Sequence, residues 1–598
     1  MQEQKYSVNQ HLLETIVVWV KSGEIAIPEI QRPFVWDAVQ VRDLMDSLYQ
    51  GYPVGYLIAW RNPTVRLKDG TRSEGKKILI DGQQRVTALM AEVLGHSVLT
   101  KDYQRVRIRI AFHPQDERFE VCNSAIEKDS AWIPEIAPLV NGERGLIKSV
   151  RDYCVTNPDC DPDQIEAAIA NLMQISKKQT GFIELAADLD IETVTEIFIR
   201  INSKGVVLSQ ADFAMSKIAA SEQHGGPTLR KAIDYFCHLA VAPEFYHTIV
   251  DVDQAFASTD LFRKMAWMRQ ENDELYDPAY TDMLRVAFAS EFERGRLQDL
   301  VSLLSGRNFE TRQYEEDIAA ASFQRLQTGV ERFINETHFK RFLMIVRSAG
   351  FIEASLIRSQ NVLNFAYTLY LKLRVQGYEP HLIEHYVRRW LVLSMLTGRY
   401  SSASETQFDY DIRHIASRDF GELLCDVEAA ELSETFWTVA LLQHLNTSVA
   451  SSPYLHVFWA AQVSADDRGF LSQEIRVRDL ITHRGDIHHI FPRDYLKQHA
   501  LLRGQYNQIA NYVYTQSEIN IRIGKASPAE YMQAVVAQCH EGPVRYGGIT
   551  YLAQLWQNLA ANSIPEAVCT MTVDDYDDFL AERRRLMAHK MRDYYGKL

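Results

Sequence analysis

The sequence predicts a protein of mixed α/β and α class, with an α/β N-terminal domain, a helical middle region and a mainly helical C-terminal domain. Three observations support this prediction. The chain has 598 residues, which is too long for one hydrophobic core and indicates roughly two to four domains. Strand-like and helix-like segments alternate near its start. Apolar residues recur at helical spacing through much of the rest.

The N-terminal elements follow from local pattern. A helix is predicted to open near Asp37 and to run toward Tyr49, with apolar side chains at helical spacing. The Gly- and Pro-containing segment 51–55 breaks the chain, and residues 56–60 are predicted as a strand. A further strand over 78–80 leads into a tight Asp-Gly turn, after which residues 86–94 continue as a helix.

The turn itself is Asp81-Gly82-Gln83-Gln84-Arg85. A strand, a tight turn and a helix start present backbone N–H groups and a positive dipole end to an anion. Arg85 is placed to fork onto phosphate oxygens from an exposed helix start, Gln83 and Gln84 to hydrogen-bond a nucleotide, and Asp81 to hold a metal ion or to cap the helix. The turn is not a Walker A loop, and from the residues alone a simple helix cap is the stronger alternative.

The middle of the chain carries no chemical motif. Residues 297–304, 322–334 and 361–374 have helical periodicity, and Gly377-Tyr378-Glu379-Pro380 is the clearest linker signal before a helix over 385–397. We therefore predict domains over 1–215 and 381–598, joined by a helical connector over 216–380.

The segment Asp486-Ile487-His488-His489-Ile490-Phe491-Pro492 is followed by Asn511 and Asn520. Adjacent side chains on a strand point to opposite faces, so we expect one histidine to face a metal ion and the other to face the attacking water. Asn511 begins the predicted second strand, from which its amide oxygen is placed to accept the far N–H of the base histidine. Asn520 is expected to open the next helix and to offer its amide oxygen to the ion.

So sparse a ligand set suits Mg²⁺, or Mn²⁺, which keeps several of its waters. The alternative for the histidine pair alone is a hydrogen-bonded pair in a hydrophobic core. The segment resembles the HNH (ββα-metal) nucleases. That resemblance implies His489 as general base, His488 and Asn520 as metal ligands and Asn511 as the residue that orients the base. Many such enzymes have Asp where His488 stands, and Asp486 is a further ligand candidate.

Charge is unevenly distributed. The whole chain carries a net charge of −14, yet residues 471–525 contain eight Lys and Arg against five Asp and Glu. We expect phosphate contacts there from four residues, although a solvated helix face gives the same pattern: Arg493, Lys497, Arg522 and Lys525. The seven cysteines form no CxxC pair, no apolar run is long enough to span a membrane, and the N-terminus has no export signal, so we expect a cytoplasmic protein.

Ile30-Gln31-Arg32-Pro33-Phe34-Val35-Trp36 and the Asp81–Arg85 turn together resemble the ParB/sulfiredoxin-like domain of GmrSD-type, modification-dependent (type IV) restriction enzymes. The run from Ile197 through Arg200, Asn202 and Gly205 to Asp212 fits the same family. The resemblance implies an N-terminal module that binds or hydrolyses a nucleotide, ATP or GTP, and controls a C-terminal HNH module. Carried over, its nucleotide-site candidates are Gln31, Arg32, Asp81, Gln83, Gln84 and Arg85.

The sequence thus predicts an endonuclease that cleaves double-stranded phage or other foreign DNA with modified bases or backbone, and a homodimer is plausible because two strands must be cut. Two alternatives stay open. One is a nucleotide-dependent DNA-binding regulator with an inactive nuclease domain. The other is a nuclease that acts on RNA or on unmodified invader DNA.

Overall fold

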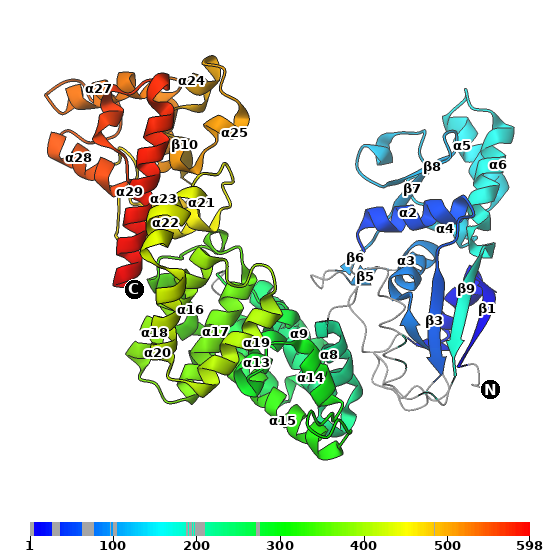
Figure 1. The fold of residues 1–598 in the computed structure, drawn as a ribbon. Helices are drawn as coiled ribbons and strands as arrows, with labels where there is room; N and C mark the ends of the chain where they lie inside the picture. The colour runs from blue at the N-terminus through cyan, green and yellow to red at the C-terminus, as the bar shows by residue number, and fades with distance from the viewer. Residues whose placement is uncertain are drawn as a thin grey trace. The chain divides into compact units, whose positions relative to one another are not determined.

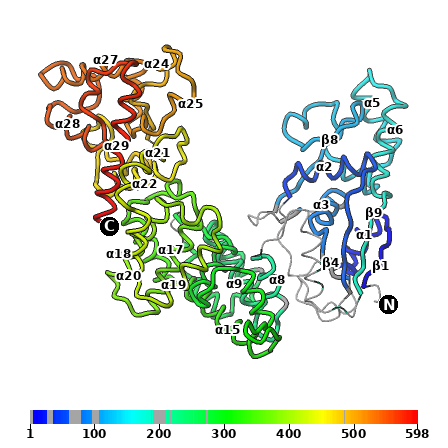
Figure 2. Tube along the Cα trace, in the orientation of Figure 1, coloured from blue at the N-terminus to red at the C-terminus, as the bar shows by residue number. Residues whose placement is uncertain are grey.

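The computed structural model describes residues 5–26, 36–61, 77–95, 97–99, 105–186, 189, 194, 197, 210–270, 275–483 and 485–598. These residues are mostly helical, with a small sheet in the N-terminal region (Figure 1). The chain divides into two compact units, Met1–Arg230 and Lys231–Leu598, whose traces Figure 2 shows. The domain boundaries expected at residues 215 and 380 stay predictions.

In the part of the N-terminal unit that the structure describes, five strands form one mixed sheet in the order β1-β9-β3-β4-β2. β1 is antiparallel to β9, β9 is parallel to β3, β3 is antiparallel to β4, and β4 is parallel to β2. The strands are β1 (Tyr6–Leu12), β2 (Ile25–Ala26), β3 (Tyr56–Arg61), β4 (Lys77–Asp81) and β9 (Gln179–Leu185).

One face of this sheet is covered by α1 (Leu13–Lys21) and α3 (Gln83–Leu94). Ile16 of α1 and Val86 of α3 join Leu57, Leu79 and Phe182 of the strands in one buried cluster. The apolar side chains of each helix lie at helical spacing, and this packing fixes where α3 begins at the end of β4.

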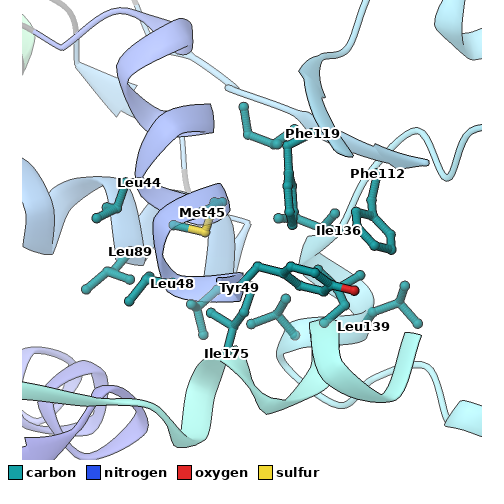
Figure 3. Packing of buried hydrophobic residues seen from close by; sticks show 14 of the residues in the cluster. Leu44, Met45, Leu48, Tyr49, Leu89, Phe112, Phe119, Ile136, Leu139 and Ile175 are labelled. Atoms are coloured by element: carbon teal, nitrogen blue, oxygen red, sulfur yellow. The ribbon is translucent and has the colours of Figure 1, made fainter. Parts of the chain in front are cut away.

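A second core lies around α2 (Ala38–Tyr49). Figure 3 shows Leu44, Met45, Leu48 and Tyr49 of this helix packed with Phe112 and with other residues of the cluster. The remaining elements of this unit are β5 (Val98–Leu99), β6 (Arg105–Val106), β7 (Ile110–His113), β8 (Arg118–Val121), η1 (Ile126–Lys128), α4 (Ala137–Val140), α5 (Leu146–Thr156), α6 (Pro162–Met173), η2 (Gln174–Lys177), α8 (Gln210–Ala220) and η3 (Glu222–His224).

The C-terminal unit is helical through its first part, as expected of the middle region. The ranges predicted from periodicity correspond to α14 (Leu297–Leu304), α15 (Glu316–Phe333), α17 (Gln360–Val375) and α18 (Pro380–Thr397). α17 is buried on nearly all sides because it packs against α13 and α18. The other elements here are α9 (Gly226–Val241), α10 (Phe245–Val252), α11 (Gln254–Ala257), α12 (Asp260–Lys264), η4 (Ala266–Arg269), α13 (Tyr280–Phe292), α16 (Glu336–Ser348), η5 (Ala354–Leu356), α19 (Ser404–Ser417) and α20 (Phe420–Glu431).

The last part of the chain surrounds a short strand pair, β10 (Asp486–His489) and β11 (Tyr512–Thr515). The long helix α29 (Tyr576–Lys597), red in Figure 1, packs against η7 (Ile509–Asn511) and α22 (Pro453–Ser464). The other elements are η6 (a π-helix, Phe436–Ala440), α21 (Leu441–His444), α23 (Val477–Thr482), α24 (Arg493–Gln498), α25 (Arg503–Tyr506), α26 (Ser517–Ile523), α27 (Pro528–Gln538), α28 (Leu552–Ala561), η8 (Glu566–Thr570) and η9 (Val573–Asp575).

Among the described residues, no helix combines the length and the apolar character needed to cross a membrane.

Candidate functional site

The histidine pair lies on β10, and the chain order strand, strand, helix is the one expected. β10 pairs antiparallel with β11, with His488 opposite Val513 and His489 opposite Tyr512, and α26 follows β11 directly. Asn511 ends η7 just before β11. Asn520 lies inside α26 and does not open it, because the helix already begins at Ser517.

The two histidines face opposite sides of β10, as strand geometry predicted. His488 is buried and lies 2.6 Å (Nδ1) from Oδ1 of Asn520. His489 is half-buried and lies 3.0 Å (Nε2) from Oδ1 of Asn507, with its ring edge-on to Tyr512. One strand therefore presents two imidazoles to two different environments.

Asp486, Asn520 and His488 form a hydrogen-bonded chain. Nδ2 of Asn520 donates to Oδ2 of Asp486 at 2.9 Å. Because the amide nitrogen is turned to the carboxylate, the amide oxygen must be the acceptor, so Nδ1 of His488 carries the proton. Burial lowers the pKa of His488 to about 4, opposed in part by the hydrogen bond to Asn520. The ring is therefore neutral at pH 7, and a neutral imidazole can ligate a metal.

These donors fit a hard divalent cation. Neighbouring oxygen or nitrogen ligands of Mg²⁺, each about 2.1 Å from the ion, lie about 3 Å apart. The 2.6 Å between His488 Nδ1 and Asn520 Oδ1 needs to open by only a few tenths of an ångström, roughly, for an ion to replace the proton. That proton can move to Nε2, which is buried and makes no hydrogen bond within the described residues. The described ranges hold no cluster of three or more His, Cys, Asp or Glu suited to a metal, so the set depends on the Asn520 amide.

On the opposite side, the pKa of His489 is lowered overall, because the effect of burial exceeds the opposing effect of the hydrogen bond to Asn507. His489 is thus neutral in neutral solution and able to accept a proton. Its Nδ1 makes no hydrogen bond in the described part of the chain.

The expected contact between Asn511 and His489 is wrong. Asn511 is fully buried, its Oδ1 accepts from the backbone N–H of Phe491 at 2.8 Å, and its Nδ2 donates to the carbonyls of Phe491 (3.0 Å) and Tyr506 (3.3 Å). The side chain precedes β11 and bridges the two strand ends behind His489, so its amide is fully used there. It fixes the loop, and Asn507 takes the position beside the imidazole.

Sequence reasoning missed Asn507 because an asparagine after a short helix is ordinary turn chemistry. Its N–H donates to the carbonyl of Arg503 at 3.2 Å, closing the last turn of α25. Only the tertiary fold brings this turn to His489, which is 18 residues earlier in the chain.

The four basic residues predicted to contact phosphate lie on elements that flank the histidine strand. Arg493 and Lys497 are exposed on α24, which follows His489, and both lie near Asp494. Arg522, on α26 with Asn520, is exposed and donates to the carbonyl of Arg545, and Lys525 is exposed just beyond that helix.

In the N-terminal unit the strand, turn and helix are confirmed, with Gly82 at a left-handed φ of 94° between β4 and α3. A Cβ at Gly82 would lie 2.2 Å from the side chain of Leu57. The turn therefore requires glycine both for its left-handed backbone and for this close approach. Arg85 is not the exposed, available cation expected. It is mostly buried, donates to the carbonyl of Val54 at 2.9 Å and pairs with Asp81 at 3.0 Å, so Asp81 does not cap the helix.

The other predicted nucleotide-site residues differ in their surroundings, and two of them are not described. Gln83 is buried, and Oε1 of Gln84 accepts from the backbone N–H of Trp36 at 3.3 Å. Trp36 itself packs partly against the α2 core. Gln31 and Arg32 lie outside the described residues, as does the whole run from Phe198 to Leu208.

Comparison with known families matches the N-terminal part of the chain. Residues 13–219 match the family described as GmrSD restriction endonuclease, N-terminal domain, and this match supports a GmrSD-type restriction endonuclease family. It covers roughly a third of the chain and ends before the histidine strand. No curated protein matches the sequence.

Proposed function

We propose that this protein is a metal-dependent endonuclease that cleaves modified foreign DNA, and that a nucleotide bound by its N-terminal unit controls the cut. The match of residues 13–219 supports the restriction class. The observation that carries the proposed chemistry is one strand with two neutral histidines on opposite faces, His488 held by Asn520 and His489 held by Asn507.

In this proposal His489 is the general base. The lowered pKa keeps the imidazole free of its proton near neutrality, and the side chain is only half-buried. Arg493, Lys497, Arg522 and Lys525 would bind the phosphates on either side of the cut. Asn511 contributes by holding the two strand ends together.

His488, Asn520 and Asp486 would hold Mg²⁺ or Mn²⁺, which when bound would polarise the phosphoryl oxygen and stabilise the leaving oxygen. A neutral histidine, an amide and one carboxylate suit an ion that keeps most of its waters.

The nucleotide, ATP or GTP, is proposed to bind at the start of α3 with Asp81, Gln83, Gln84 and Arg85, joined by Gln31 and Arg32. The strand-to-helix turn supports this, because backbone N–H groups at a helix start favour phosphate. Since Arg85 is already paired with Asp81, a phosphate would have to compete for its guanidinium. Cutting both strands favours a homodimer.

The test incubates purified protein with matched plasmids, unmodified or carrying defined base or backbone modifications, with and without Mg²⁺ and NTP. We expect cleavage of a modified plasmid that needs the metal. His489→Ala should reduce the single-turnover rate by roughly 10²–10⁴-fold and leave DNA binding nearly unchanged. Binding without cleavage in wild type would favour the regulator. Cleavage of RNA or unmodified plasmid would favour the other alternative, and wild-type rates in His489→Ala would contradict the assigned chemistry.

A further inference from the structure

Asn507 lies beside the proposed general base, although it is not among the site residues predicted from the sequence. It follows the single turn of α25, within the segment that joins β10 to β11, and its Oδ1 lies 3.0 Å from Nε2 of His489. An amide oxygen only accepts hydrogen bonds, so this contact requires a proton on Nε2. The lone pair of the neutral ring is then on Nδ1.

The turn that carries Asn507 is held from two directions. The hydroxyl of Tyr576, on α29, donates to the carbonyl of Gln505 at 3.0 Å, and the amide of Asn511 donates to the carbonyl of Tyr506 at 3.3 Å. Tyr506, just before Asn507, is therefore hydrogen-bonded to the strand ends, and Gln505 is hydrogen-bonded to α29. An orienting side chain must itself be fixed to fix its partner.

The backbone on the other side of the turn is fixed as well. Arg583 of α29 is fully buried, and its guanidinium donates to the carbonyls of Ala510 and Tyr512, each at 2.7 Å. These carbonyls flank Asn511 and begin the strand that pairs with His489. Both His489 and Asn507 are thus attached to the same rigid frame.

We propose that Asn507 is a positioning residue for the reaction, which fixes the ring orientation and tautomer of His489 so that Nδ1 faces the attacking water. This inference rests on the proposed nuclease function. In the step, one O–H bond of the water breaks and its proton passes to Nδ1, while the water oxygen forms a bond to phosphorus. The bond from phosphorus to the leaving oxygen breaks, and that oxygen takes a proton from solvent.

Two substitutions that keep the branched shape of the side chain separate orientation from packing. Asn507→Asp keeps an acceptor oxygen at the same place, whereas Asn507→Leu removes it. We expect Asn507→Leu to lower single-turnover kcat by roughly 10–100-fold at little-changed KM, the usual cost of losing a partner that orients a functional histidine. Asn507→Asp should recover most of the rate. Gln508→Leu is the matched control, because Gln508 points to the Gly504 carbonyl and not to His489.

Ring ¹⁵N spectra of histidine-labelled full-length protein give a readout that packing alone would not move. With His489→Ala used to assign the signal, wild type should show Nε2 protonated, and Asn507→Leu should show a mixture of tautomers or the other one. Equal thermal midpoints in the variants establish that they fold. Wild-type kcat and tautomer in Asn507→Leu, with His489→Ala inactive, would overturn this inference alone. Cleavage by His489→Ala would overturn the function on which it rests.

Discussion

The proposed chemistry of this protein depends on how single side chains share hydrogen bonds. Asn520 gives its nitrogen to Asp486 and its oxygen to His488, and Asn511 uses its whole amide on the strand ends. The sequence identified both asparagines but not their partners. Residue type and spacing narrow the chemistry, whereas the direction of an amide depends on which backbone groups lie near it in the fold.

The role of Asn520 is open to a direct test. We predict that Asn520→Ala raises the Mg²⁺ concentration needed for half-maximal cleavage by roughly 10–100-fold, because it removes a ligand oxygen and also frees His488 and Asp486. Titration of Mg²⁺ against cleavage rate, with EDTA as the zero point, measures this. A control is Ser517→Ala, at the start of the same helix. Full activity of wild type in EDTA would contradict the metal-dependent mechanism.

His456, on α22, predicts a loss of stability in acid. Burial and, to a smaller extent, the nearby Arg358 together lower its pKa to about 4. Above pH 6.5 the ring is neutral in both the folded and unfolded states, so the folded state keeps its full stability. As pH falls below 6.5, the unfolded state gains a proton that the folded state takes up only near pH 4, so stability is lost in this window.

The expected share of His456 is about 2 kcal/mol of unfolding free energy between pH 7 and pH 5. Urea unfolding of wild type and His456→Gln at both pH values measures it, because the variant keeps the contribution of His488 and loses that of His456. Equal pH dependence in the two proteins would show that His456 protonates freely in the folded state.

At the scale of elements, the sequence predicted those helices and strands that depend on their own local residue pattern. The range 297–304 predicted from periodicity is the observed range of α14. The strand, turn and helix predicted around Asp81 correspond to β4 and α3. β1 and β9 escaped prediction, because β1 is mostly exposed and its partner is far along the chain, with Tyr6 opposite Leu185. The support that α29 gives to β11 was not predicted either, because it also depends on contacts between residues far apart in the chain. In the sequence, Arg583 is only one of several basic residues on a helix.

Arg583 allows a prediction about this support. Burial lowers the pKa of its guanidinium to about 9, and no carboxylate of the described residues pairs with it, so its charge is stabilised by carbonyl dipoles. Arg583→Met should lower the unfolding free energy by roughly 2–4 kcal/mol, because buried carbonyls lose their donors, and should slow cleavage. Arg585→Met is the control, since Arg585 is exposed and pairs only with Glu582; its cost should stay below about 0.5 kcal/mol. Equal stability of the two variants would contradict this supporting role of Arg583.

At the scale of the whole molecule, the proposed control couples two units that are far apart in sequence. A nucleotide at the start of α3 alters cleavage only if it binds one state of the protein more tightly than another. By linkage, DNA would then change nucleotide affinity by the same factor. The pairing of Arg85 with Asp81 and Val54 supplies an element that a phosphate would have to rearrange.

We therefore predict that Arg85→Ala weakens NTP binding and reduces cleavage together, with some loss of stability because the Val54 carbonyl loses its donor. The measurement titrates NTP against both binding and plasmid cleavage. Arg144→Ala is the matched control, as Arg144 is an exposed arginine of the same unit that pairs with Asp152. Cleavage indifferent to NTP in wild type, or unchanged in a variant that binds none, would reduce the N-terminal unit to a scaffold.

The opposed faces of His488 and His489 have a consequence for how this site can change over time. Because side chains alternate along a strand, a slip of β10 by one residue against β11 would exchange the sides of the two imidazoles. Asn511, bonded to both the N–H and the carbonyl of Phe491, holds the pairing at one register. A single residue added or removed between His489 and Phe491 should therefore abolish cleavage even where the fold survives the change. Substitutions elsewhere on the surface can alter the charge of the proposed site far more readily than any change can move these two histidines.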